Sequence, residues 1–124
     1  MHAYQDIPLS LNFNVVISAP CLHASCLTYM ESVLKPGASV LDVGCGSGYL
    51  CAALYEMTKK EDGMANVVGI EHVDVLAQFS YDNLYKNYQT PLENGSIKIV
   101  CGDGRLGYKD CALFDAINVG AASD

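Results

Sequence analysis

The chain has 124 residues, enough for one domain with a modest core, and 51% of them are hydrophobic. Its formal net charge is −7 and its seven Lys and Arg residues are scattered. This argues against a nucleic acid partner, because neutralising phosphates needs a basic face. No apolar run reaches the length of a membrane span, and no basic segment followed by an apolar stretch opens the chain. We therefore expect a cytoplasmic protein without a membrane partner.

The first part of the chain contains one predicted helix. Residues 1–17 read as irregular, and a helix is expected from Pro20 to Leu34, where the segment 35–37 (Lys-Pro-Gly) ends it. Apolar residues recur in this helix at intervals of three and four. They predict one apolar stripe, formed by Leu22, Cys26, Met30 and Val33.

The rest of the chain alternates between predicted strands and helices. Two helices are expected, Tyr49–Lys60 and Asp74–Tyr88, with Asp74 as the N-cap of the second and residues 90–95 as a loop after it. Four short apolar segments are predicted to be strands: Ala38–Val43, Asn66–Glu71, Ser96–Cys101 and Phe114–Val119.

This order predicts an α/β fold with a doubly wound, Rossmann-like sheet of parallel strands in the order 3-2-1-4. The two helices carry the sheet one way from the first strand, so the chain then returns to that strand's other side. A doubly wound sheet normally continues beyond this point, and we interpret the chain as a portion of a longer protein. Strand 114–119 would be an apolar edge. We expect either missing order near residues 110–124 or a contact from another chain.

The cysteine pattern gives no sign of a metal site. No two cysteines have Cys-x-x-Cys spacing, and no histidine lies at zinc-like spacing from a pair of them. We interpret them as free, buried thiols in a reducing compartment, with disulfides or redox sensing as the alternatives. The six cysteines are Cys21, Cys26, Cys45, Cys51, Cys101 and Cys111.

The turn after the first strand is the most informative segment. Gly44, Gly46 and Gly48 follow Asp42 directly, so a strand ends in an acid, a glycine-rich turn and a helix start. Glycines without a Cβ let the backbone turn sharply and approach a ligand closely. Dinucleotide folds use a different spacing, G-x-G-x-x-G, to hold a pyrophosphate. An acid suits a cofactor with a cationic end, such as S-adenosyl-L-methionine (SAM), which has a sulfonium, an ammonium and no phosphate.

Acids also end the next two predicted strands. Because the carboxyl ends of parallel strands line one crevice, Asp42, Glu71 and Asp103 are expected to converge there. Glu71 lies 23 residues beyond Gly48, near the distance at which such an acid holds a ribose diol. Asp103, between two glycines, is placed to accept from the amine of a planar base. Any one of these acids alone could equally be a solvated turn residue.

Several segments together resemble the protein-L-isoaspartate (D-aspartate) O-methyltransferase family, a class of SAM-dependent enzymes. The similarity covers nearly the whole chain. The glycine turn alone is typical of methyltransferases in general, whereas the segments around Ser18 and Asp103 are specific to this family. The matching segments are Asp6 with Pro8, residues 17–24 (Ile-Ser-Ala-Pro-x-x-His-Ala), 41–49, 68–72, 102–108 (Gly-Asp-Gly-Arg-Leu-Gly-Tyr) and 114–122.

The resemblance implies one partial SAM-dependent methyltransferase domain over residues 1–124. It would transfer a methyl group from SAM, releasing S-adenosyl-L-homocysteine (SAH), to the free carboxyl of isoaspartyl and D-aspartyl residues in damaged proteins and peptides. Ser18 would be the catalytic residue, positioning the substrate carboxylate. A purely structural role for Ser18 is a helix N-cap ahead of Pro20, and both roles can hold together. His23 would close over the site, Glu71 would hold the ribose, and Asp103 with Gly104 would meet the adenine. The implied cofactor-binding residues are Val15, Val16, Ile17, Ser18, His23, Asp42, Gly44, Gly46, Gly48, Glu71, His72, Asp103 and Gly104.

Two departures from the family pattern leave alternatives open. Val16 stands where the family usually has Thr, and the family's N-terminal helix and last strands are absent. These departures favour a non-catalytic SAM-binding or partner-binding module, which the intact glycine turn and acids oppose. Another methyltransferase on the same sheet is a second alternative, and a dinucleotide oxidoreductase is a third. The glycine spacing and Asp42 argue against the third.

Overall fold

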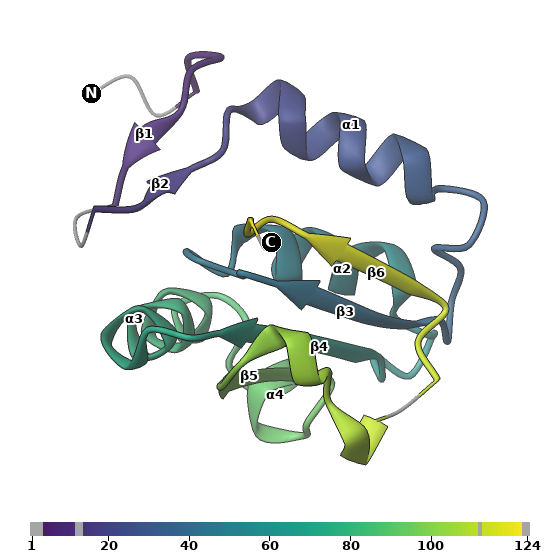
Figure 1. The fold of residues 1–124 in the computed structure, drawn as a ribbon. Coiled ribbons are helices and arrows are strands. Elements are labelled where there is room, and N and C mark those ends of the chain that lie inside the picture. Colours follow the sequence, from purple (N-terminus) through teal and green to yellow (C-terminus); the bar gives the residue numbers. More distant parts are fainter. Residues whose placement is uncertain (1–3, 12–13, 112, 123–124) are drawn as a thin grey trace.

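A computed structural model of the chain describes residues 4–11, 14–111 and 113–122. Its centre is a parallel sheet of four strands in the order β5-β4-β3-β6, which confirms the predicted order 3-2-1-4 (Figure 1). The strands are β3 (Ser39–Val43), β4 (Asn66–Glu71), β5 (Ile97–Cys101) and β6 (Ala116–Val119). The predicted bounds of β4 are confirmed, and the other three strands begin one or two residues later than predicted.

The helices are shorter than their sequence patterns suggested. They are α1 (Pro20–Met30), α2 (Tyr49–Thr58) and α3 (Asp74–Tyr85). The N-cap of α3 is Val73 rather than Asp74, which is the first helical residue and makes no side-chain capping bond. The predicted loop at 90–95 is wrong for residues 90–93, because Gln89–Glu93 forms a fourth α-helix, α4, and the turn is confined to residues 94–95.

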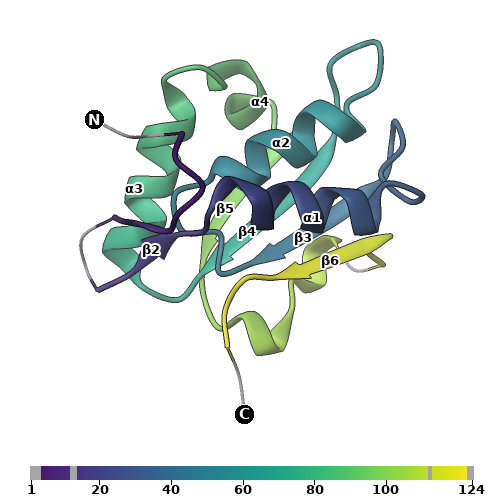
Figure 2. The ribbon, with the colours of Figure 1, turned by 90° about the horizontal axis from the view of Figure 1, so that it is seen from above.

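Two short antiparallel strands precede the first helix. They are β1 (Leu9–Ser10) and β2 (Val16–Ile17), so part of the segment expected to be irregular is a small hairpin. Seen from above, α1 crosses over β3 and β4, with the hairpin at its amino end (Figure 2). Asp6, which precedes β1, connects this N-terminal segment to α1. Its carboxylate accepts a 2.8 Å hydrogen bond from the backbone N–H of Cys21 in the first turn of the helix.

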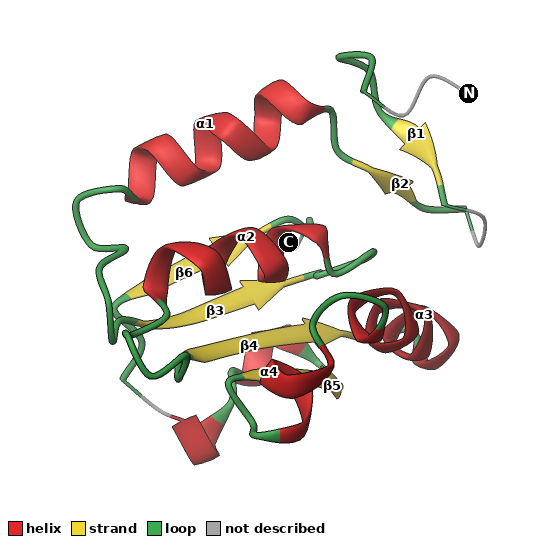
Figure 3. Cartoon of the chain, turned by 180° about the vertical axis from the view of Figure 1, so that it is seen from behind, coloured by secondary structure: helices red, strands yellow, loops and turns green. Residues whose placement is uncertain are grey.

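One face of the sheet carries the main core. Alternate strand residues such as Val40, Val67 and Ile97 pack there against Leu54 of α2 and Leu84 of α3. The helices α1 and α2 lie on this side (Figure 3). None of the α1 residues is buried, and Met30 is the member of the predicted stripe that packs against the core. The helix forms a wall above the strand ends.

The opposite face is covered by the crossover from β5 to β6. This segment contains two short 3-10 helices, η1 (Gly104–Leu106) and η2 (Lys109–Cys111). Tyr108 and Phe114 from the crossover pack against a smaller apolar cluster formed by Leu41, Val68 and Ile70. Connections therefore pass over both faces of the sheet, as the doubly wound arrangement requires.

The outer strand β6 has regular strand structure, and some of its apolar side chains are exposed. Its Ile117 and Val119 side chains are 56% and 60% exposed. The expected loss of order near residues 110–124 is wrong for residues 110, 111 and 113–122, whereas residues 112, 123 and 124 lie outside the described part. A covering contact from another chain stays a prediction.

All six cysteines are free thiols. The expectation that they are buried holds only for Cys45 and Cys51, since Cys21 and Cys101 are exposed and the other two are partly exposed. Within the described ranges, no helix is both long enough and apolar enough to cross a membrane.

Candidate functional site

The glycine turn links β3 to α2 through left-handed backbone. Gly44, Gly46 and Gly48 have φ values of +80°, +53° and +78°, which side chains with a Cβ rarely adopt. Gly48 is also tightly packed, because a Cβ there would lie 2.7 Å from the Ser80 hydroxyl oxygen. A Cβ on Gly46 would find no atom closer than 3.9 Å and would project into open space. Gly48 is therefore needed for packing, and Gly46 keeps a space clear.

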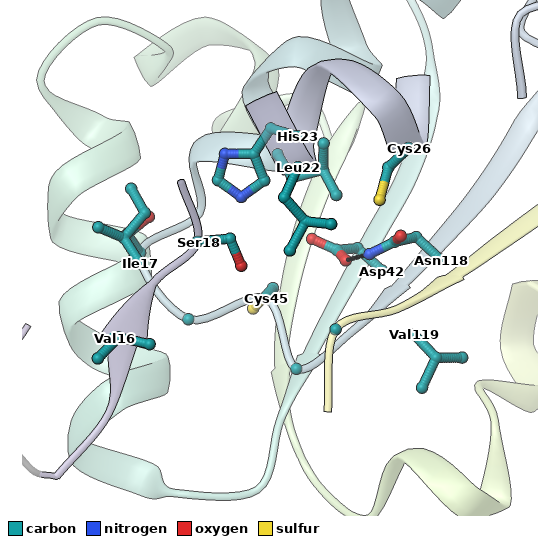
Figure 4. Close-up of a pocket in the computed structure, with 15 residues that line it drawn as sticks. Val16, Ile17, Ser18, Leu22, His23, Cys26, Asp42, Cys45, Asn118 and Val119 are labelled. Atoms are coloured by element: carbon teal, nitrogen blue, oxygen red, sulfur yellow. Dashed lines mark hydrogen bonds between the residues drawn. The ribbon is translucent and has the colours of Figure 1, made fainter. Parts of the chain in front are cut away.

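That space is a cavity of about 210 Å³ above the turn (Figure 4). Its walls come from three parts of the chain that are far apart in sequence, and in Figure 4 the Ser18 and Leu22 side chains point into it. The lining residues are Val16, Ile17, Ser18, Leu22, His23, Cys26, Asp42, Gly44, Cys45, Gly46, Ser47, Leu50, Asn118, Val119 and Gly120.

Asp42 is the charged group of this cavity and is 2% exposed. One carboxylate oxygen accepts a 2.8 Å hydrogen bond from the Asn118 amide, and the other accepts from the Cys51 thiol at 3.4 Å. Burial raises the pKa of Asp42 above the ordinary aspartate value, the bonds from Asn118 and Cys51 oppose the rise, and the charge of Glu71 adds to it. A buried carboxylate of this kind favours a cationic ligand group.

Glu71 lies at the end of β4 and is also buried, with its side chain 5% exposed. Its carboxylate accepts from the backbone N–H of Gly46 at 3.2 Å and from that of His72 at 3.0 Å. The Nδ1 of His72 lies 3.2 Å from the same carboxylate. Glu71 therefore braces the glycine turn, a contact that the sequence did not suggest. Its role as the ribose ligand stays a prediction.

A second, larger cavity of about 840 Å³ lies beside the first. Its walls are mostly apolar, with His72, Asp103 and Arg105 as the ionisable groups. The Arg105 guanidinium donates hydrogen bonds to the Asp103 carboxylate from Nε at 3.0 Å and from Nη2 at 2.7 Å. These side-chain bonds, followed by the backbone N–H of Arg105, lower the pKa of Asp103 to about 2. Gly104 packs closely here, since a Cβ would lie 2.3 Å from Val43.

The lip of the first cavity is the segment from Val15 to Ser18, of which Val16 is 59% exposed. The N-cap of α1 is Ala19 rather than Ser18, so the capping interpretation of Ser18 is wrong. His23 stacks on Tyr49, with ring centroids 5.2 Å apart, and partial burial lowers its pKa below the ordinary histidine value. Both Ser18 and His23 line the cavity.

The two cavities bring together most of the residues that the sequence singled out. Gly44 belongs to both linings, and Val15, Gly48 and Glu71 lie outside them. The sequence missed Asn118, whose contact with Asp42 depends on strand register. It also missed Leu22 and Cys26, because their spacing reads as a core stripe of α1.

Comparisons with known proteins agree on one family. The family model for protein-L-isoaspartate(D-aspartate) O-methyltransferase matches residues 1–124. Protein-L-isoaspartate O-methyltransferase 1 of Arabidopsis thaliana is 45% identical over 98% of the chain, and the Caenorhabditis elegans protein-L-isoaspartate O-methyltransferase is 42% identical over 97% of it. The chain spans about half the length of these relatives, 52% of each.

A solved structure shares the fold. A Plasmodium falciparum chain described as a protein-L-isoaspartate O-methyltransferase, in complex with SAH, superposes with a TM-score of 0.87 at 35% identity. The match covers 97% of this chain and 57% of that one. Because the family model spans all 124 residues, the chain belongs to the protein-L-isoaspartate(D-aspartate) O-methyltransferase family.

Proposed function

We propose that the protein transfers a methyl group from SAM to the free carboxyl of L-isoaspartyl and D-aspartyl residues in damaged proteins, which starts their repair. The observation that carries the proposal is the cavity in which Ser18 of the lip faces the glycine turn. The family-specific segments around Ser18 and Asp103 line the two adjacent cavities at the carboxyl ends of the strands. Family membership supports the same reaction.

The residues present suit SAM as cofactor. The open space above Gly46 is a cradle that a Cβ would fill, so a ligand chain has room to pass over the backbone. The buried Asp42 carboxylate would receive the cofactor's ammonium group, and the apolar second cavity, beside Asp103 and Gly104, would take the adenine. Glu71, between the two, would hold the ribose.

SAM, when bound, supplies a methyl group activated by a sulfonium. The substrate carboxylate is already ionised at neutral pH, so the protein needs no general base for it. Ser18 would donate a hydrogen bond that orients this carboxylate, while the lip and His23 exclude water from the reacting groups. The sparse set of polar groups around Ser18 is sufficient for this task.

The proposal extends to partners and location. The partners would be isoaspartyl-containing proteins and peptides, and nucleic acid and membrane are not expected to take part. The cytoplasmic location expected from the sequence belongs to the same proposal, supported by the six unpaired thiols, which suit a reducing compartment.

Paired peptides test the substrate. A chimera that adds the remaining length of the Arabidopsis thaliana relative to this chain should methylate a peptide containing one isoaspartate. It should leave the twin peptide with normal aspartate nearly unlabelled. Equal labelling of both peptides would overturn the isoaspartyl assignment and leave a broader methyltransferase. SAH binding without labelling of either peptide would support the non-catalytic module instead.

A further inference from the structure

The contact between Asn118 and Asp42 joins the outermost strand to the floor of the first cavity. The Asn118 amide donates to Asp42 at 2.8 Å, and both side chains line the cavity (Figure 4). We infer that Asn118 is a positioning residue that keeps the Asp42 carboxylate ionised and turned toward the cofactor's ammonium group. This inference rests on the proposed function, because it assigns a role within the same cofactor site.

Strand register explains why Asn118 reaches Asp42. In the parallel ladder between β3 and β6, Asp42 lies directly beside Asn118. Successive side chains on a strand point to opposite faces, so Ile117 and Val119 point away from Asp42. A shift of the register by one residue would place an apolar side chain beside the buried carboxylate. The polar residue in the apolar run of β6 is therefore matched to the acid of β3.

The groups around Asp42 leave Asn118 as its strongest neutral donor. Burial disfavours the Asp42 charge most strongly, and repulsion from Glu71 of β4 adds to this. On α2, the Cys51 thiol donates at the longer distance of 3.4 Å, and its pKa is well above the ordinary thiol value, first because of its contact with Cys45. His23 of α1 also lines the cavity, but burial lowers its pKa and so favours its neutral form. No fixed cation among the described residues offsets the Asp42 charge, so a cationic ligand would.

The first test needs no variant. SAH carries the ammonium group, whereas 5′-methylthioadenosine shares its nucleoside and lacks the amino acid part. In the unaltered chain, we expect SAH affinity to fall as pH decreases through the pKa of Asp42, and 5′-methylthioadenosine affinity to stay flat over the same range. Parallel pH profiles for the two ligands would overturn the inference.

The second test replaces the donor. Asn118→Leu keeps the side-chain shape and removes the amide, so we expect the pKa of Asp42, followed by carbon-13 NMR of the ligand-free protein, to rise. SAH affinity measured by calorimetry at pH 7 should fall roughly 10- to 100-fold, the range for a hydrogen bond to a charged group. Affinity for 5′-methylthioadenosine should change by less than about twofold.

A conservative variant separates positioning from folding. Asn118→His places an imidazole Nδ1–H at the distance of the amide nitrogen, and we expect it to return the pKa of Asp42 to that of the unaltered chain and to restore most of the SAH affinity. An unchanged Asp42 pKa in Asn118→Leu, or equal weakening of both ligands, would overturn this inference while leaving the proposed function intact. Failure of the unaltered chain to bind SAH would overturn the proposed cofactor, and this inference with it.

Discussion

The two cavities at the strand ends differ in how their carboxylates are held. Asp42 is buried under α1 and fixed by partners from two other elements, whereas Asp103 is exposed and held by Arg105 two residues away. The contacts of Asp42 depend on the tertiary fold. The ion pair of Asp103 with Arg105 is local, and solvent screens the attraction between its charges. The buried, fixed carboxylate of Asp42 therefore lies where the cationic end of the ligand is expected. The exposed pair of Asp103 and Arg105 lies beside the apolar walls of the second cavity. Changes on the Asp42 side should have the larger effects.

The largest effect is expected from the glycine turn that separates the two cavities. Gly48→Ala should lower the free energy of unfolding by roughly 2–4 kcal/mol, because it adds left-handed strain and a clash with Ser80 and Leu84. Urea denaturation measures this loss.

Gly46→Ala is the matched control, because it carries similar backbone strain but meets open space. It should cost only about 1 kcal/mol of stability. Equal losses for Gly46→Ala and Gly48→Ala would show that packing does not distinguish the two glycines.

A substitution of Glu71, between the cavities, tests whether the ribose of the cofactor binds at this position. Glu71→Ala should weaken SAH binding by roughly 1–3 kcal/mol, because a hydrogen bond to a charged group is lost and the Gly46 N–H loses its brace. Calorimetry should show a similar loss for 5′-methylthioadenosine, in contrast to the selective effect of Asn118→Leu. Unchanged affinities in a folded variant would remove Glu71 from the ribose site.

Ser18 tests the lip of the Asp42 cavity. Ser18→Ala in the chimera should reduce turnover by about tenfold and leave SAH affinity nearly unchanged, since a positioning hydrogen bond acts mainly on the transition state. The measurements are initial rates with the isoaspartyl peptide and calorimetry with SAH. Because Ser18 does not cap α1, a drop in stability is not expected, and unchanged turnover would exclude Ser18 from the active site.

The smallest effect is expected at the exposed pair of the second cavity. Arg105→Gln should raise the pKa of Asp103 from about 2 toward the ordinary aspartate value of about 4. Because the folded pKa is lowered, the pair contributes stability above about pH 4 and loses it as pH falls toward 2. Carbon-13 NMR titration measures the pKa of Asp103. An unchanged pKa would mean that Arg105 does not hold the carboxylate in solution.

The sheet was predictable because its information is local. Apolar runs bounded by glycines and acids placed the four strands, and the crossover rule gave their order. The five-residue helix Gln89–Glu93 was not predictable, because so short a segment shows no periodicity and depends on the packing of Leu92 into the core. The two-residue strands of the hairpin were not predicted for the same reason, because so short a segment shows no periodicity.

The candidate site was predictable in its residues more than in its contacts. The glycine turn and the three acids stood out by type and spacing. Their partners did not, because Asn118 reaches Asp42 only through the register of β3 and β6, 76 residues apart in sequence. The bond from Gly46 to Glu71 likewise links distant segments. Sequence patterns indicated which groups carry chemistry, and tertiary structure determined which of them are fixed.

Calorimetric titration of the chain with SAH and with NAD measures which cofactor the glycine turn accepts. We expect SAH to bind, NAD not to bind, and Gly46→Ala to abolish SAH binding because its Cβ fills the cradle above the turn. Binding of NAD, or SAH binding that is indifferent to Gly46→Ala, would overturn the proposed cofactor site.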